Sequence, residues 1–217
     1  MECTPATTAA INRAATLLRA GELAIVPTDT VYGIAADIRC DRAVRAIPAA
    51  KGRDPGAPLQ LMFGAPGRQV EVYAAMTPAG RALVEALGPG GWTLIVPAVE
   101  GWDSPALAGG RTVGIRVPAS PVVQALVEAL GAPLAASSAN RHGEPSPLNC
   151  TRAVASLGGA CAIALDAGPS PAGLDSTIID LTGTGAPIIA REGAIDRDTV
   201  ARILGLKEIS VLRSVRP

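Results

Sequence analysis

Four clusters of polar residues lie at the ends of apolar segments, where α/β proteins usually build their ligand-binding clefts. The clusters are Thr28–Tyr32, Lys51–Arg53, Ser137–Asn140 with Ser146, and Asp175–Thr177 with Arg191. One such cluster means little alone. Four clusters of similar chemistry together indicate a site for an anionic, hydroxyl-rich ligand.

The second cluster places two cations, Lys51 and Arg53, on either side of a glycine. In a cleft this pair would clamp phosphate groups, with Arg53 as a forked donor and Lys51 as a point charge. Basic residues in the last turn of a helix also simply offset the helix dipole. Both interpretations stay open on the sequence alone.

The hydroxyl-rich clusters also allow two interpretations. Thr28, Asp29 and Thr30 form a sequence typical of an Asx or ST turn. Ser138 and Asn140 suit contacts with a phosphate or a ribose, although such residues also cap turns.

Arg116 is the most informative single residue, because it lies inside the apolar strand sequence TVGIRVP (112–118). A buried arginine needs a carboxylate or phosphate partner, since leaving a buried charge unpaired costs about 3–5 kcal/mol. Asp29 and Asp175 are the candidate protein partners, and an anionic ligand is the alternative.

The common catalytic and nucleotide-binding motifs are absent from the sequence. There is no P-loop, no G-x-G-x-x-G after the first strand, no G-x-S-x-G and no H-E-x-x-H. The one histidine, His142, lies in a loop rich in Gly and Pro and is expected to be exposed. An enzyme with this sequence must therefore work mainly by positioning and electrostatics.

The elements that would position these clusters alternate between strands and helices. Strands are expected at 22–27, 59–63, 93–97, 112–118, 132–140, 161–166, 176–182 and 187–191, with a weaker one at 208–212. Helices are expected at 8–20, 41–50, 77–88, 120–131, 151–157 and 196–204, and Pro48 is expected to shorten or kink the second. The apolar runs are continuous, which predicts a mixed sheet covered on both faces and an α/β fold.

Three of the helices have clear start signals. Thr7 or Thr8, Thr77 and Ser120 are predicted N-caps, and the last two are each followed by a proline at the first helical position.

Composition excludes several classes of protein. Lys plus Arg and Asp plus Glu number 19 each, so there is no cationic surplus for a protein that coats nucleic acid. Five aromatic residues are few for a sheet on which bases stack. The 48% of hydrophobic residues predicts a globular chain with a core rich in Ala and Val.

The four cysteines, Cys3, Cys40, Cys150 and Cys161, have no C-x-x-C spacing and only one histidine to join them. We therefore expect no zinc site and four reduced thiols in a cytosolic protein. The sequence shows no secretory signal and no apolar run long enough to span a membrane, which predicts a cytoplasmic location without membrane partners.

Six motifs, in order along residues 11–195, resemble those of the YrdC/TsaC family, the threonylcarbamoyl-AMP synthases. They are PTDTVYG (27–33), KGR followed by PL (51–59), TVGIRVP (112–118), SSAN with a later PS (137–146), DSTIIDL (175–181) and AREGAI (190–195). The resemblance implies the YrdC-like α/β fold, a twisted mixed sheet with helices around a deep, positively charged cleft. It places a catalytic domain at 1–195 and a short extension, packed on or near the cleft, at 196–217.

The resemblance also implies an activity. L-threonine, bicarbonate and ATP would give threonylcarbamoyl-AMP and pyrophosphate, with Mg²⁺ held mainly through the ATP phosphates. The product would serve downstream tRNA-modifying proteins in threonylcarbamoylation of the adenosine beside the anticodon. Direct, stable binding of nucleic acid by this chain is not expected.

Carried over position by position, the resemblance assigns roles to individual residues. Lys51 and Arg53 are the expected catalytic clamp on the nucleotide phosphates. The expected ATP-binding residues are Lys51, Arg53, Thr112, Ser138, Asn140, Ser146 and Arg191, and the expected L-threonine-binding residues are Thr30, Arg116, Ala136 and Ser176.

The chain departs from the family pattern at several positions, and Met62 and Ala57 are the two that bear on the ligands. Met62 stands where many members have histidine, and Ala57 stands where lysine or asparagine is common. These departures leave one alternative open, a paralogue that binds another nucleotide or carbamoyl compound. A second alternative, of a different class, is an RNA-binding module.

Overall fold

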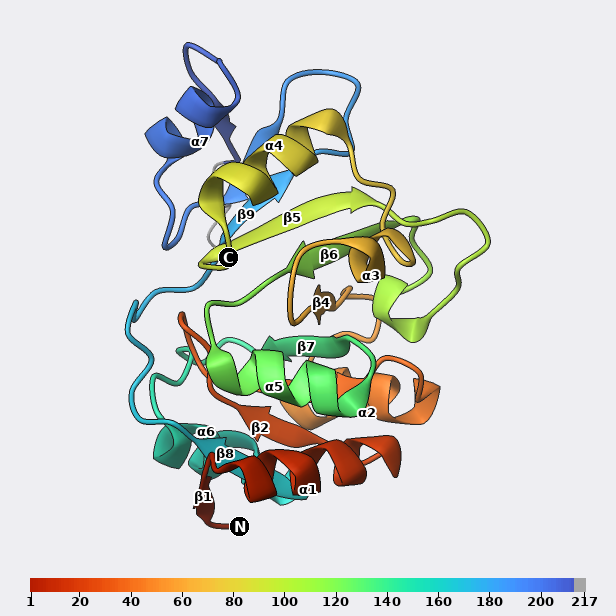
Figure 1. The fold of residues 1–217 in the computed structure, drawn as a ribbon, viewed down its shortest axis with the longest axis vertical. Coiled ribbons are helices and arrows are strands. Elements are labelled where there is room, and N and C mark those ends of the chain that lie inside the picture. The colour runs from red at the N-terminus through yellow and green to blue at the C-terminus, as the bar shows by residue number, and fades with distance from the viewer. Residues whose placement is uncertain (213–217) are drawn as a thin grey trace.

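A single mixed β-sheet runs the length of the molecule in the computed structural model, which describes residues 1–212 (Figure 1). Within these residues the strands follow the order β1-β8-β2-β3-β7-β4-β6-β5-β9-β10-β11. The strands are β1 (Cys3–Pro5), β2 (Ala24–Val26), β3 (Gly33–Asp37), β4 (Gln60–Met62), β5 (Trp92–Pro97), β6 (Thr112–Arg116), β7 (Leu134–Ser138), β8 (Ile163–Asp166), β9 (Thr177–Asp180), β10 (Ile188–Arg191) and β11 (Ser210–Val211).

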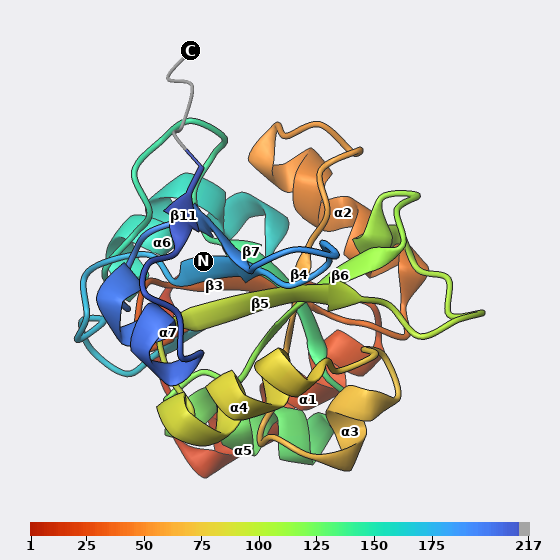
Figure 2. The same cartoon turned by 90° about the horizontal axis from the view of Figure 1, so that it is seen from above.

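Helices cover both faces of this sheet, as Figure 2 shows. On one face lie α1 (Thr8–Arg19), α3 (Arg68–Glu71), α4 (Pro78–Leu87) and α5 (Pro121–Leu130), and on the other lie α2 (Asp41–Lys51) and α6 (Cys150–Leu157). The short α7 (Arg197–Ile203) packs beside α4, and two 3₁₀ turns complete the set, η1 (Pro105–Leu107) and η2 (Gly158–Ala160). The predicted α/β class with a mixed sheet is confirmed.

The predicted helix caps are confirmed. The side chains of Thr7, Thr77 and Ser120 accept hydrogen bonds from backbone N–H groups in the first turns of α1, α4 and α5. These bonds satisfy donors that have no partner within the helix. The cap of α5 does more, because the Ser120 hydroxyl also donates to the carbonyl of Pro27 at 2.9 Å.

Several features differ from the sequence-based expectations: β1 and α3 were not predicted, and α2 and β3 also differ. The helix α2 is not shortened at Pro48 but continues to Lys51, since the proline lies only one turn from its end. β3 was not predicted, because Gly and Ala have low strand propensity. It forms because β2 and β7 both pair with it in antiparallel fashion and bury all five of its residues.

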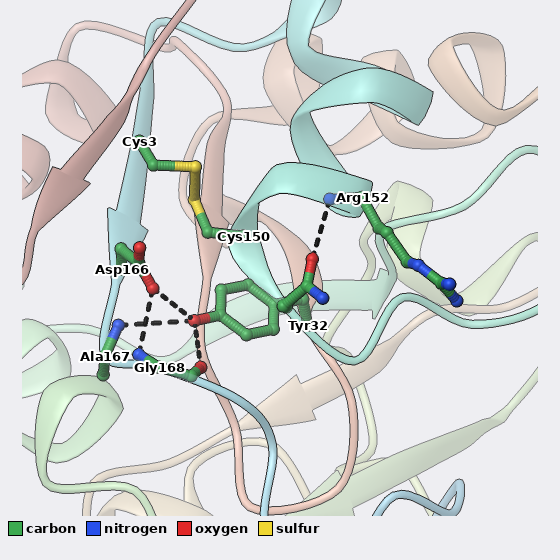
Figure 3. The surroundings of a disulfide bond; sticks show 8 residues. Cys3, Tyr32, Cys150, Arg152, Asp166, Ala167 and Gly168 are labelled. Carbon is green, nitrogen blue, oxygen red and sulfur yellow. Dashed lines mark hydrogen bonds between the residues drawn. A yellow bond between two sulfur atoms is a disulfide. The ribbon is translucent and has the colours of Figure 1, made fainter.

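The expectation of four reduced thiols is wrong for two of them. Cys3 on β1 and Cys150 at the start of α6 form a disulfide, with their Cα atoms 6.1 Å apart (Figure 3). They are 147 residues apart in the sequence, so no local spacing pattern could reveal the pair. Cys40 and Cys161 are free thiols, and burial raises the pKa of Cys161 to about 12.

Tyr32 lies beside this disulfide and ties the turn after β2 to the end of β8 (Figure 3). Its ring is buried, and its hydroxyl lies 2.6 Å from the carbonyl oxygen of Gly168 and 3.1 Å from Asp166 Oδ1. Burial, as the main cause, raises the pKa of Tyr32 to about 12, so this hydroxyl serves as a structural donor.

Residues 196–212, the described part of the predicted extension, contribute a strand to the sheet. β11 pairs in parallel with β10. The last five residues of the predicted extension, 213–217, lie outside the described residues, and the boundary at 195 stays a prediction. No helix among residues 1–212 is long and apolar enough to cross a membrane.

Candidate active site

A cavity of about 420 Å³ is lined by residues of the sheet and by Lys51 at the end of α2. The structure brings ten of the eleven predicted site residues to its walls: Thr30, Lys51, Arg53, Thr112, Arg116, Ala136, Ser138, Asn140, Ser176 and Arg191. Ser146 is the exception. Its hydroxyl contacts Asp175, which lines the cavity, at 3.1 Å.

The floor of the cavity consists of alternate residues from five neighbouring strands, which is the spacing that places side chains on one face of a sheet. In the middle of the floor, the two residues that flank Gln60 are small. Gly114 on β6 and Ala136 on β7 lie in register on either side of Gln60 on β4. Because Gly114 and Ala136 have little or no side chain, there is space above the sheet for a ligand.

Lys51 is the last residue of α2, and the helix ends there because Gly52 takes a left-handed conformation with φ of 63°. The buried ammonium group donates to the backbone carbonyls of Ser138 and Asn140, the latter at 2.7 Å. Burial first, and then the charge of Arg53, lower the pKa of Lys51 to about 8. Carbonyl oxygens orient this cation without neutralising it, so it remains able to pair with an anion.

Asn140 connects Lys51 to the loop that follows β7. Its Oδ1 lies 3.4 Å from the Lys51 Nζ, while its Nδ2 donates to the carbonyls of Arg141 and Glu144. The backbone N–H of His142 in turn donates to the Lys51 carbonyl at 2.8 Å. His142 is exposed, as predicted, and lies at the cavity wall.

Arg116 has the carboxylate partner that its place in a strand requires. Its Nη2 lies 2.7 Å from Asp29 Oδ1, and its Nε donates to the Gly90 carbonyl at 3.2 Å. Of the two candidate partners, Asp29 is therefore the one that pairs with it. Burial lowers the pKa of Arg116, an effect that Asp29 opposes.

Thr30 is held by the turn that its cluster was expected to form. The Thr28 hydroxyl donates to the Val31 carbonyl and accepts from the backbone N–H of Thr30. Thr30 is fully buried from bulk solvent, yet it lines the cavity. The turn and ligand-site interpretations of this cluster are thus compatible.

The motifs around Ser176 and Arg191 pack directly against each other. Arg191 donates from Nε and Nη2 to the Ser176 carbonyl, at 3.1 and 2.9 Å. A Cβ atom on Gly193 would lie 2.8 Å from the carbonyl carbon of Ser176, so only glycine allows this approach. The contact fixes Ser176 and leaves Arg191 half-exposed at the cavity.

Four cationic side chains, those of Lys51, Arg53, Arg116 and Arg191, line this cavity, together with one carboxylate, that of Asp175. Burial lowers the pKa of Arg53, as it does for Arg116. The excess of cations is the arrangement that binds a polyanion such as a triphosphate. The net charge of the cleft, predicted as positive, stays a prediction.

Sequence reasoning missed two residues of the floor, Gln60 and Thr93. Both line the cavity, and the Thr93 hydroxyl donates to Gln60 Oε1 at 3.0 Å. The available signal was a polar residue within the otherwise apolar run LQLMF. Met62, by contrast, is buried in the core and does not line the cavity.

The donor set around the cavity fits a magnesium ion that arrives on a nucleotide. Asp175 is the carboxylate in the wall, and Mg²⁺ is commonly held by one or two carboxylates together with substrate phosphates. Among residues 1–212, the one cluster of three His, Cys, Asp or Glu ligand atoms is Cys3, Cys150 and Asp166, which does not line this cavity.

Comparisons of the whole sequence with known proteins give relatives that match most of this chain. A relative from Mycobacterium tuberculosis (strain ATCC 25618 / H37Rv) is 38% identical over 197 residues, covering 89% of this chain and 88% of its own. The threonylcarbamoyl-AMP synthase of Bacillus subtilis (strain 168) is 34% identical over 196 residues, covering 90% of this chain and 56% of its own.

A solved structure shares the fold. The crystal structure of P. abyssi Sua5 complexed with L-threonine superposes with a TM-score of 0.88 at 33% identity, covering 94% of this chain and 59% of that one. The chain therefore spans somewhat more than half the length of the B. subtilis and P. abyssi proteins. The family model Sua5/YciO/YrdC, described as Telomere recombination, matches residues 16–193. The match spans most of the sequence and includes the whole cavity, and the chain belongs to the Sua5/YciO/YrdC family.

Proposed function

We propose that this chain is a threonylcarbamoyl-AMP synthase, which converts L-threonine, bicarbonate and ATP to threonylcarbamoyl-AMP and pyrophosphate. The observation that carries the proposal is the single cavity in which Lys51, Arg53, Arg116 and Arg191 converge with hydroxyl groups. The name of the B. subtilis relative and the L-threonine in the P. abyssi structure support it.

The ATP end of the cavity lies where α2 meets β7. Here Lys51 and Arg53 bind the phosphates, and Ser138, Asn140 and Arg191 complete the nucleotide site with Thr112. Ser146 acts through Asp175, to which its hydroxyl donates.

The amino-acid end lies beside Arg116. This arginine has one guanidinium edge on Asp29 and Gly90, and it binds the threonine carboxylate through the rest of the group. Thr30, Ser176 and the backbone at Ala136 surround the remainder of L-threonine.

The reaction requires no covalent bond between the protein and its substrates. The threonine amine adds to bicarbonate with loss of water, giving an N-carboxylate, whose oxygen attacks the α-phosphorus and expels pyrophosphate. Fixed cations offset the charge on the phosphoryl groups as this bond forms. No side-chain nucleophile is needed, which agrees with walls of cations, amides and hydroxyls.

Magnesium belongs to the same proposal. When bound, Mg²⁺ would neutralise phosphate charge and orient the pyrophosphate leaving group. Asp175 is the residue that would hold it from the protein side, with the remaining ligands supplied by phosphate oxygens and water.

The test is pyrophosphate release from ATP, measured with and without L-threonine and bicarbonate. We expect release to require both. Release that ignores both co-substrates would show that the proposal is wrong and favour the paralogue alternative. The structure gives that alternative no support, since Met62 lies in the core.

The product is a reactive mixed anhydride, and we propose that downstream tRNA-modifying proteins in the cytoplasm consume it. The net charge of zero argues against stable tRNA binding by this chain itself. A gel shift with tRNA at several salt concentrations tests this point. Tight binding with a steep salt dependence would favour the RNA-binding alternative.

A further inference from the structure

Gln60 occupies the centre of the cavity floor. Its neighbours in register are Gly114 on β6 and Ala136 on β7, so no long side chain stands beside it. The residue is half-buried and lines the cavity.

The Gln60 side chain extends across β6 toward β5. β6 lies between β4 and β5 in the sheet, yet Gln60 Oε1 accepts a hydrogen bond from the hydroxyl of Thr93 on β5. The crossing passes over Gly114, which has no side chain. A Cβ atom there would already be in van der Waals contact with the Gln60 Cβ, at 3.4 Å, and with the Thr93 Cγ2, at 3.5 Å, so a longer side chain would fill the path.

The contact that holds the Gln60 amide is made by its oxygen, which accepts from the Thr93 hydroxyl. Thr93 Oγ1 also lies 2.8 Å from Ser176 Oγ, and Ser176 accepts hydrogen bonds from Arg191 through its carbonyl. This chain of contacts spans the floor and holds the end of the Gln60 side chain beside Thr93. Among the described residues 1–212, Nε2 of Gln60 donates to no protein group, so its two N–H donors are available to a ligand.

The register places Gln60 between the two ends of the site. Along β6, Arg116 lies two residues from Gly114 in one direction and Thr112 two residues in the other. Along β7, Ser138 lies two residues from Ala136, on the side of Lys51. Gln60 therefore stands between the groups assigned to the threonine carboxylate and those assigned to the nucleotide.

We propose that Gln60 Nε2 donates to the carboxylate that bicarbonate contributes, in bicarbonate itself and in the N-carboxylate of threonine. The inference rests on the proposed function, since that reaction is what places a carboxylate between the amino acid and the α-phosphorus. The amide binds this oxygen through a neutral donor and directs it toward the nucleotide.

The experiment compares Gln60→Leu and Gln60→Glu with the wild-type protein. The KM for bicarbonate is measured in degassed buffer at saturating ATP and L-threonine, and threonine binding is measured separately by calorimetry. We expect Gln60→Leu to raise the bicarbonate KM about tenfold or more, the scale of one hydrogen bond to a charged group. Gln60→Glu should raise it further, because a carboxylate there repels the substrate. Threonine affinity should change by less than about threefold.

Two more variants separate this role from a structural one. Thr93→Val removes the donor to Oε1, and it should raise the bicarbonate KM by less than Gln60→Leu does, because the amide is present but unanchored. Gln69→Leu replaces a glutamine that does not line the cavity and should match the wild type. Gln60→Met, of nearly the same length, replaces Gln60→Leu if thermal unfolding shows that the latter is unstable.

The outcomes are distinct. An unchanged bicarbonate KM in Gln60→Leu, or an equal weakening for ATP and threonine, overturns the assignment of Gln60 while leaving the proposed function intact. If the wild-type protein releases pyrophosphate without either co-substrate, the proposed function itself fails, and the assignment fails with it.

Discussion

At the scale of single residues, the site depends on cations that are held in place but whose charge the protein does not fully neutralise. Within residues 1–212, the Lys51 ammonium donates to carbonyl and side-chain oxygens of uncharged residues, and Arg116 pairs with one carboxylate, that of Asp29. Such residues are oriented before any ligand arrives. Preorganised charges of this kind stabilise a transition state without reorganisation at the moment of reaction.

Replacing Lys51 should therefore reduce turnover strongly. We expect Lys51→Met to lower kcat for pyrophosphate release by roughly 100-fold, the loss typical of one preorganised electrostatic contact. The matched control is Lys207→Met, which alters an exposed lysine beyond α7 and should leave kcat unchanged. A Lys51→Met protein with near-wild-type kcat would mean that the phosphate site has been misplaced.

The lowered pKa of Lys51 predicts a pH dependence of ATP binding. Protonated Lys51 attracts the triphosphate, so affinity should be full below the pKa of about 8 and decline as the pH rises through it. Calorimetry between pH 7 and pH 9.5, without L-threonine, should show the Kd for ATP rising at least severalfold. Lys51→Met should bind weakly and with little pH dependence over the same range. A flat wild-type profile would contradict the prediction.

At the scale of elements, the helices contribute mainly through residues at their first or last turns. α2 delivers Lys51 at its last turn, with Gly52 allowing the chain to turn away. α5 is capped by Ser120, whose hydroxyl also donates to the Pro27 carbonyl just before the Thr28 turn. α6 begins at Cys150, which the disulfide fastens to β1.

The disulfide should stabilise the whole fold. In the chain-entropy account, cross-linking a loop of more than 100 residues contributes about 4–5 kcal/mol. We expect Cys150→Ser to lower the free energy of unfolding in urea by a few kcal/mol, and a reductant to do the same to the wild-type protein.

The matched control for this prediction is Cys40→Ser, which removes a free thiol and should have little effect. In this control a reductant should still destabilise the protein. Equal stability of the wild-type protein with and without reductant would show that the cross-link contributes nothing.

At the scale of the whole molecule, one cavity draws its walls from segments spread over most of the chain, from Thr30 to Arg191. Ligands that fill it bind only the folded state. Binding therefore adds to stability by mass action.

This arrangement predicts a thermal shift. L-threonine at about 100 times its Kd should add about 2.7 kcal/mol to the free energy of unfolding, which raises Tm by roughly 5–10 °C in a protein of this size. Arg116→Lys keeps a charge beside Asp29 but lacks the guanidinium fork, so the same threonine concentration should raise its Tm much less. Equal shifts in both proteins would place threonine elsewhere.

The sequence by itself determined most of the elements and identified ten of the residues that line the cavity. Continuous apolar runs and the caps at Thr7, Thr77 and Ser120 are local signals, and they correctly predicted the main helices and most strands. Polar residues at the ends of these segments also predicted the site, because α/β proteins place their ligand sites where strand ends meet.

Tertiary structure alone decided the features that depend on neighbours distant in sequence. β3 is a strand because β2 and β7 flank it, and Cys3 meets Cys150 because β1 pairs with β8. Gln60 becomes a site residue because strand pairing sets it beside Gly114, and its side chain reaches Thr93 on the next strand. Register and pairing between strands set these contacts, and local sequence does not encode them.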